Sequence, residues 1–311
     1  MIDGHFSAQT IRRQHAEGTV ISCPTGYNPS MPITRDSIRN YYDQNTRLFL
    51  AFNRSRKADN IHRSLWTDGA KTIEDALDAA NERIRAEIES VAPTQARIAD
   101  LGCGVGASLF YIVPRLQEPM SAFGLTLSPV QARLAGQFAR QAHLEKQILF
   151  AEGDFTSVPL AGESLDAIYS VEAVVHAPEP ERYFDETSRL LRRGGKLILV
   201  DDFLADRPLT RNETVWSSAF INGWHVPGVT TVGQAKSFAE KHRLQLTGND
   251  DLTPYLRLRA LPEILAQALL FIGNRFPLEH AILPSMLGSM ALQQCLYMNV
   301  IEYRFLVFEK I

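Results

Sequence analysis

Residues 97–106 read RIADLGCGVG, a short apolar run that ends in three glycines at alternate positions. A segment typical of a helix follows at residues 108–117. Glycines at a strand–helix junction let the backbone approach a ligand closely, and the first turn of the helix offers free N–H groups. The stretch therefore predicts a ligand-binding turn. A tight turn without a ligand is the plainer alternative, which three alternate glycines disfavour because each lowers stability.

Further strands and helices alternate on both sides of this turn. Strand-like runs occur at residues 120–128, 147–154, 165–173 and 194–204, and helix-like segments separate several of them. Strands joined by helices form right-handed βαβ units, which build a parallel sheet. Two more strands are predicted at residues 242–252 and 300–311, with a helical block at residues 261–298 between them. The sequence therefore predicts an α/β fold.

The composition is that of an ordinary globular protein. The 311 residues are 45% hydrophobic with a net charge of −3, which excludes intrinsic disorder and offers no field to attract nucleic acid. Cys23, Cys103 and Cys295 are too scattered for a disulfide framework or a zinc cluster. No signal peptide is recognisable, and the longest apolar stretch, residues 264–272, is too short to span a bilayer. We expect a cytoplasmic protein without nucleic-acid partners or transmembrane segments; homo-oligomerisation stays open.

The glycine spacing indicates the class of ligand. It is G-x-G-x-G and not the G-x-G-x-x-G of dinucleotide-binding folds, and the preceding acid suits a cation better than a pyrophosphate. The segment resembles the first motif of class I S-adenosylmethionine-dependent methyltransferases. This resemblance implies a Rossmann-like seven-stranded sheet ending in an antiparallel hairpin, and S-adenosyl-L-methionine as cofactor. The implied contacts are Asp100, Gly102, Cys103 and Gly104 at the methionine end, and Asp154 with Phe155 at the adenine.

One departure from the superfamily pattern narrows the group. Residues 124–129 read GLTLSP, without the acid that most members use to hold the ribose. This segment is similar to cyclopropane-fatty-acid synthases, sterol methyltransferases and bacterial prenyl-diphosphate C-methyltransferases. In that group Thr126, Leu127 and Gln131 would take over the ribose contacts. An ordinary strand end whose hydroxyls cap the next helix is the plainer alternative.

The segment after the fourth predicted strand carries the candidate catalytic residues. Residues 169–178 read YSVEAVVHAP and resemble the I-E-A-x-x-H-A-P segment of sterol C-methyltransferases. Those enzymes methylate an alkene carbon and form a carbocation, which a carboxylate can stabilise and deprotonate. The resemblance makes Glu172 the first candidate for this role and His176 the second. The alternative for Glu172 is a helix cap or a structural hydrogen-bond partner, and the alternative for His176 is a structural or substrate-positioning role.

An aromatic and basic segment at residues 35–70 resembles the cap of alkene methyltransferases. Aromatic side chains there and in the connection after the fifth strand are candidates for the substrate pocket, although helical spacing is also typical of core residues. The basic side chains suit a diphosphate, with Mg²⁺ only in that case, although a solvated loop is the default. The candidate substrate-binding residues are Tyr41, Tyr42, Trp66 and Trp224 for the aromatic wall, and Arg56 and Arg63, with Arg54, Lys57 and His62, for the diphosphate.

These features predict three units and several competing functions. Residues 1–80 would form an arm and helical cap, residues 81–205 the cofactor-binding core, and residues 206–311 a substrate cavity plus strands that complete the sheet. The main hypothesis is C-methylation of an isoprenoid alkene, on a prenyl diphosphate or a sterol-like apolar lipid. O- or N-methylation of a small natural product is the alternative, with cyclopropanation or a cofactor-binding scaffold without activity as weaker ones.

Overall fold

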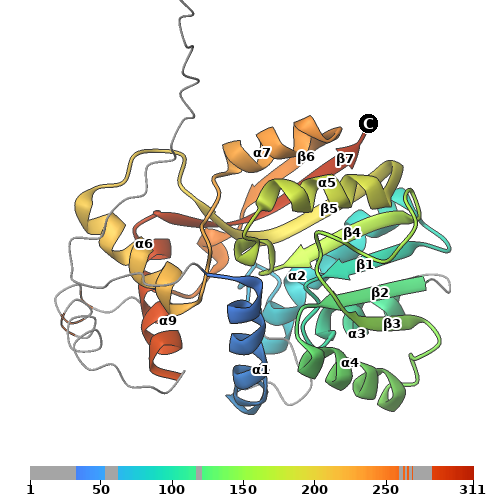
Figure 1. Ribbon diagram of the computed structural model, residues 1–311, viewed down its shortest axis with the longest axis horizontal. Coiled ribbons are helices and arrows are strands. Elements are labelled where there is room, and N and C mark those ends of the chain that lie inside the picture. The colour runs from blue at the N-terminus through green and yellow to red at the C-terminus, as the bar shows by residue number, and fades with distance from the viewer. Residues whose placement is uncertain are drawn as a thin grey trace, which may run out of the picture.

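A computed structural model describes residues 33–52, 62–116, 121–258, 262, 265, 268 and 282–311 (Figure 1). The expected arm at residues 1–30 lies outside these residues. So do Arg54, Arg56 and Lys57, and much of the predicted helical block at residues 261–298.

Seven strands form one sheet in the order β3-β2-β1-β4-β5-β7-β6 (Figure 1). The first five strands along the chain pair in parallel, and β7 runs antiparallel to both β5 and β6. The predicted α/β sheet with a C-terminal antiparallel hairpin is therefore confirmed. The strands are β1 (Arg97–Leu101), β2 (Ser121–Thr126), β3 (Ile148–Glu152), β4 (Leu165–Val171), β5 (Leu191–Leu204), β6 (Leu244–Asp251) and β7 (Ile301–Lys310).

The sheet separates two hydrophobic cores because successive side chains of a strand point to opposite faces. Along β5, Ile198 and Val200 belong to the core that includes residues of α2 (Ile73–Val91), α3 (Ala107–Ile112), α6 (Arg211–Gly223) and α9 (Ile282–Tyr297). Leu197 and Leu199 belong to the core that includes residues of α5 (Pro180–Leu190) and α7 (Val232–Lys241). Helices on both faces leave the carboxyl ends of the strands as the open edge where α/β proteins bind ligands.

The start of α2 illustrates how the local sequence sets an element. The Thr72 hydroxyl accepts the N–H of Asp75, and the Asp75 carboxylate accepts the N–H of Thr72, which satisfies two free donors of the first turn. Ala80, Ile84 and Ile88 then form its buried stripe. The domain boundary predicted at residue 80 falls inside this helix.

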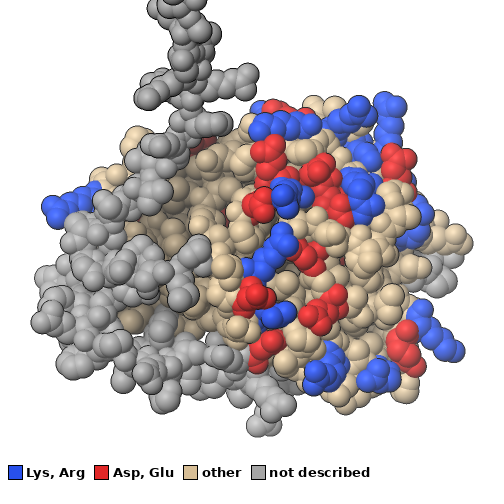
Figure 2. All heavy atoms as spheres, viewed as in Figure 1, with Lys and Arg blue, Asp and Glu red and all other residues tan. Residues whose placement is uncertain are grey.

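Helix α1 (Arg35–Phe52) lies across the carboxyl edge of the sheet, between α4 (Pro129–Gln141) and the pair formed by α6 and α9 (Figure 1). On the face seen in Figure 2, acidic and basic side chains are interspersed over the half that contains the sheet, α5 and α7. Among the described helices, none combines the length and apolar character needed to cross a membrane.

Close packing of β2 against β3 and the glycine loop gives a stability prediction. A Cβ on Gly124 would lie 2.5 Å from the Phe150 ring and 3.0 Å from the Cys103 sulfur. We expect Gly124→Ala to lower the free energy of unfolding by about 1–3 kcal/mol, because a filled core must shift to accept the methyl group. Urea unfolding measures this. Gly228→Ala, whose Cβ would meet nothing within 4 Å, is the matched control; equal stability of the two variants would contradict the prediction.

Candidate functional site

The glycine loop joins β1 to α3 and touches the turn that follows β4. The N–H groups of Gly102 and Cys103 both donate to the Leu125 carbonyl on β2, at 2.8 and 2.9 Å. Gly102 has φ +99°, and a Cβ there would lie 2.3 Å from the Cβ of Ala173. Only glycine fits, because a side chain would both strain the backbone and displace Ala173. The loop predicted to bind a ligand thus packs directly beside the predicted catalytic segment.

A cavity of about 370 Å³ opens at this edge of the sheet. Residues from every predicted segment of the site line it, including the glycine loop, the β2 end, the loop after β3, the turn after β4 and α1. The predicted residues among them are Tyr41, Tyr42, His62, Asp100, Gly102, Cys103, Gly104, Thr126, Leu127, Gln131, Asp154, Phe155, Glu172, His176 and Trp224. Arg63 and Trp66 are not in this lining, and Arg56 lies outside the described residues.

Asp100, the last but one residue of β1, is a buried acid in the cavity wall. Burial raises its pKa to about 8. No described Lys or Arg forms an ion pair with it. A carboxyl in this position is available to ionise against a positively charged ligand.

The β2 end forms a hydrogen-bonded turn. The Thr126 hydroxyl donates to Oε1 of Gln131 at 2.7 Å, and the Ser128 hydroxyl accepts the Gln131 N–H at 3.1 Å. Ser128 in turn donates to Asp43 of α1. The Ser128 hydroxyl thus caps α4, as in the plainer alternative, while Thr126 and Gln131 also line the cavity.

Asp154 binds the cap in this structure. Its carboxylate pairs with the Arg35 guanidinium at 2.7 Å and accepts the Thr156 N–H at 2.8 Å and the Thr156 hydroxyl at 2.7 Å. Its predicted partner was the adenine amino group, so a ligand there would share Asp154 with Arg35.

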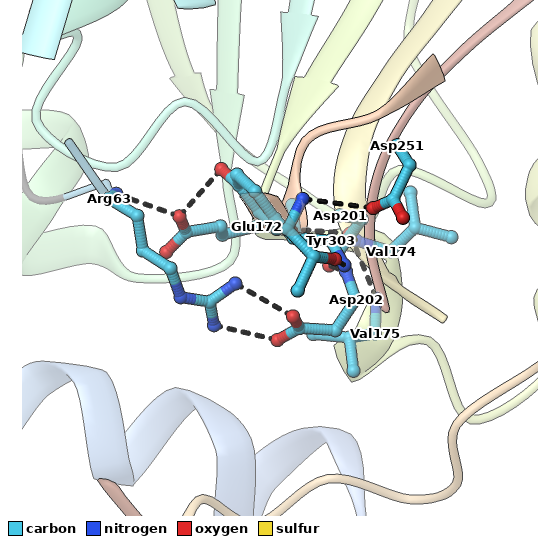
Figure 3. Close-up of polar contacts among 10 residues, drawn as sticks. Arg63, Glu172, Val174, Val175, Asp201, Asp202, Asp251 and Tyr303 are labelled. Atoms are coloured by element: carbon cyan, nitrogen blue, oxygen red, sulfur yellow. Dashed lines mark hydrogen bonds and ion pairs between the residues drawn. The ribbon is translucent and has the colours of Figure 1, made fainter. Parts of the chain in front are cut away.

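Glu172 lies immediately after β4 with a left-handed backbone, φ +50°, which is uncommon for a residue with a side chain. Its Oε1 accepts the Arg63 N–H at 2.9 Å and the Tyr303 hydroxyl at 2.8 Å. Figure 3 shows the carboxylate between these two donors. The candidate catalytic carboxylate is therefore held from the cap segment on one side and from β7 on the other.

Arg63 does not have the geometry expected of a diphosphate ligand. Its guanidinium makes two hydrogen bonds to Asp202, both 2.7 Å long, and lies 4.6 Å from the Tyr303 ring centroid (Figure 3). Trp66, expected in the pocket wall, instead packs under the Arg257 guanidinium, at 3.2 Å from its ring centroid. Each side chain is engaged by a residue remote in sequence.

Asp201 organises the turn that carries both catalytic candidates. Its Oδ2 accepts the N–H groups of Ala173, Val174 and Val175 at 3.0, 2.7 and 3.2 Å, and its Oδ1 accepts the N–H of Asp202 (Figure 3). Burial raises its pKa to about 7, with the neighbouring Asp202 adding to the shift. Sequence reasoning missed Asp201, Asp202 and Tyr303. The tandem acids at the carboxyl end of a strand were the available signal.

His176 and Tyr42 form a buried pair in the cavity wall. The Tyr42 hydroxyl and His176 Nε2 are 2.8 Å apart, and burial lowers the pKa of His176 to about 4. The imidazole is therefore neutral at physiological pH. Trp224 lines the same cavity with its Nε1 bound to the Ser285 carbonyl at 3.2 Å and the Ser289 hydroxyl at 3.1 Å.

Comparison with known proteins identifies the family. A family model described as a methyltransferase domain matches residues 99–199. The O-methyltransferase rstn1 of Aspergillus nomiae is 30% identical over 177 residues, which cover 56% of this chain and 75% of that protein. The chain belongs to the class I S-adenosylmethionine-dependent methyltransferases.

Other relatives match over a smaller share of this chain or of their own length. Methyltransferase GfsG of Streptomyces halstedii is 29% identical over 53% of this chain, and sterol 24-C-methyltransferase ERG6B of Gibberella zeae is 36% identical over 35%. The matches span 57% and 28% of those proteins' own lengths. A geranyl diphosphate methyltransferase solved with geranyl diphosphate and sinefungin shares the fold, with a TM-score of 0.69 and 18% identity over 89% of this chain and 99% of that one.

The cavity fits the family's cofactor. Its wall contains the buried Asp100 carboxyl, which can face a positive charge, and the glycine loop, which permits close approach. It also contains the hydrogen-bonded Thr126 hydroxyl and Gln131 amide. Asp100 would hold the methionine end, Thr126 and Gln131 the ribose, and Asp154 the adenine. When bound, S-adenosyl-L-methionine supplies an electrophilic methyl group.

The raised pKa of Asp100 predicts pH-dependent cofactor binding. The folded protein holds this proton more tightly than the unfolded chain, so its stabilising effect is present at acidic pH and lost as the pH rises to about 8. A cationic ligand favours the ionised carboxylate. We therefore expect affinity for S-adenosylmethionine to increase between pH 6 and about 8, with proton release on binding.

Titration calorimetry in two buffers of different ionisation enthalpy counts the released protons. Asp100→Asn should bind more weakly at pH 8 and release none. Wild-type affinity that is flat over this pH range would rule out Asp100 as the cofactor's ionising partner.

Proposed function

We propose that this protein methylates an alkene carbon of an isoprenoid substrate through a carbocation. The observation that carries the proposal is the position of Glu172. Its carboxylate lies in the wall of the cofactor cavity, after β4, and is held by the Arg63 N–H and the Tyr303 hydroxyl. A fixed carboxylate beside the reacting carbon is what a developing cation requires.

The proposed reaction needs no reactant besides the substrate and S-adenosylmethionine. The substrate π-bond attacks the methyl carbon, the carbon–sulfur bond breaks, and the positive charge moves from sulfur to the substrate. Glu172 stabilises this charge and then accepts a proton from the adjacent carbon, which restores the double bond. Tyr41, Tyr42 and Trp224 line the same cavity and would add cation–π stabilisation.

Some relatives support alkene chemistry, whereas rstn1 is an O-methyltransferase. Sterol 24-C-methyltransferase ERG6B is 36% identical over 35% of this chain, and the geranyl diphosphate methyltransferase shares the fold. Within the described wall, Asp100, Asp154 and Glu172 outnumber the basic Arg35, which Asp154 already pairs. This part of the wall favours an uncharged isoprenoid over a diphosphate. A diphosphate, with Mg²⁺, would depend on Arg56 and its neighbours outside the described residues.

A specific observation favours the second candidate, O- or N-methylation. His176 is neutral at physiological pH and hydrogen-bonded to Tyr42 in the cavity wall. A neutral imidazole can take the proton of a substrate hydroxyl or amine during methyl transfer. In that reaction Glu172 would serve only to maintain the cavity wall.

Product analysis separates these functions. The protein is incubated with methyl-labelled S-adenosylmethionine and a panel of geranyl diphosphate, farnesyl diphosphate, farnesol and a sterol. Mass spectrometry of the products then shows whether the label is on carbon or on a heteroatom. Label on oxygen or nitrogen only would reject the alkene proposal.

We expect Glu172→Gln to lower kcat about a hundredfold, equivalent to about 3 kcal/mol, because it removes the charge that stabilises the cation. The dissociation constant for S-adenosylhomocysteine, measured by calorimetry, should barely change. Thermal unfolding checks that the variant is folded. Turnover within a few-fold of wild type would eliminate Glu172 as the cation's partner.

Variants of the His176–Tyr42 pair test the second candidate function. If carbon is methylated, His176→Ala and Tyr42→Phe should each cost less than Glu172→Gln. If a heteroatom is methylated, loss of the His176 base should cost about 100-fold or more. Comparing kcat of the three variants on one substrate therefore assigns the base.

A further inference from the structure

Asp202 is a buried acid that does not line the cavity, and its carboxylate is engaged entirely with Arg63. The two parallel hydrogen bonds of 2.7 Å form the bidentate arrangement in which arginine binds a carboxylate most specifically. Burial raises the pKa of Asp202, and Arg63 counteracts the shift. A buried ion pair usually stabilises a fold no more than apolar residues of similar volume would, so stability alone does not account for this pair.

The pair joins two segments that are distant in sequence. Arg63 belongs to the cap segment, residues 62–66, and Asp202 lies near the carboxyl end of β5, 139 residues later. The cap segment has another anchor at Leu65, whose N–H donates to the Ala76 carbonyl at 2.7 Å. The Trp66 N–H likewise donates to the Tyr255 carbonyl at 2.8 Å, but neither bond involves Arg63, whose guanidinium is tied to β5 by the pair with Asp202.

The backbone of the same residue reaches Glu172. The Arg63 N–H donates to Glu172 Oε1, so the side chain of Arg63 is bound by Asp202 while its main chain binds the catalytic candidate (Figure 3). The Tyr303 ring lies under the Arg63 guanidinium, and its hydroxyl supplies the second donor to Oε1. The guanidinium of this ion pair thus contacts Tyr303, and Arg63 and Tyr303 supply the two donors that orient Glu172.

We infer that Asp202 is a positioning residue for Glu172: through Arg63, it holds the cap segment so that the Arg63 N–H and the Tyr303 hydroxyl orient the Glu172 carboxylate. The inference rests on the proposed role of Glu172. It assigns Asp202 no contact with the substrate or the cofactor. Its loss should therefore lower kcat and leave cofactor affinity unchanged.

The first test measures position directly. Hydrogen exchange of the full-length protein, saturated with S-adenosylhomocysteine, is followed by mass spectrometry for wild type and Asp202→Asn. We expect exchange of residues 62–66 to accelerate at least tenfold in the variant, while β3 stays as protected as in wild type. The matched control is Asp250→Asn, an exposed carboxylate on β6 paired with Arg83. Unchanged protection of residues 62–66 in folded Asp202→Asn would overturn the inference.

A second variant covers the case in which Asp202→Asn does not fold, since it leaves a buried arginine without its partner. Arg63→Gln keeps the backbone N–H and leaves a carboxyl that can protonate, so it is the milder change. It should show the same accelerated exchange. Tyr303→Phe removes only the hydroxyl and should leave residues 62–66 protected, which separates the two donors.

A kinetic cycle then tests whether Asp202 acts through Glu172. On the panel substrate that wild type methylates, Asp202→Asn should lower kcat about tenfold to a hundredfold, as misplacement of a reacting group does. The double variant Glu172→Gln/Asp202→Asn should be within about threefold of Glu172→Gln, because a residue acting through another is non-additive. Fully additive losses would overturn the positioning role. A harmless Glu172→Gln would instead overturn the proposed function, while the exchange result still reports on the cap.

Discussion

Four acids at the carboxyl edge of the sheet, on three adjacent strands, impose the main constraint on this site, because a carboxylate removed from water needs a partner. Asp202 is matched by the Arg63 guanidinium, Asp201 by four backbone N–H groups, and Glu172 by one N–H and one hydroxyl. Asp100 is the exception, since no described cation pairs with it and burial raises its pKa to about 8. Among the four acids, Asp100 is therefore the one whose charge the described residues leave uncompensated, which is why we propose that it faces the positively charged end of the cofactor.

The helical cap participates in the same arrangement. Arg35 pairs with Asp154 after β3, Asp43 accepts from Ser128 after β2, and Tyr42 meets His176 after β4. One face of α1 thus contacts the loops of three different strands, which are neighbours only in the folded sheet. The cap therefore stabilises a particular relative position of the three loops that we propose hold the adenine, the ribose and the methyl group.

The fold and the cavity lining could be predicted from sequence because they depend on local signals. The glycine loop, the β-strand runs and the segment around Glu172 can each be recognised from about ten consecutive residues. The parallel topology then brings the carboxyl ends of the strands together. Arg63 shows the limit. A basic residue beside aromatic ones suggests a phosphate ligand, whereas its actual partner, Asp202, is 139 residues away. Tyr303 was likewise recognisable only as a strand residue, since its hydroxyl partner is 131 residues away.

The acids also oppose one another, which bears on why Glu172 is held so tightly. Burial raises the pKa of Asp201, and the negative charges of Asp202 and Glu172 raise it further, so these neighbours make Asp201 harder to ionise. The Arg63 guanidinium offsets this repulsion, and it is bound to Asp202, which does not line the cavity. Glu172 is left with neutral donors and a left-handed backbone. A carboxylate paired with arginine would be stable but weakly attractive to a substrate cation, because its charge would already be compensated. Neutral donors orient Glu172 without cancelling its charge, which is the arrangement that cation stabilisation requires.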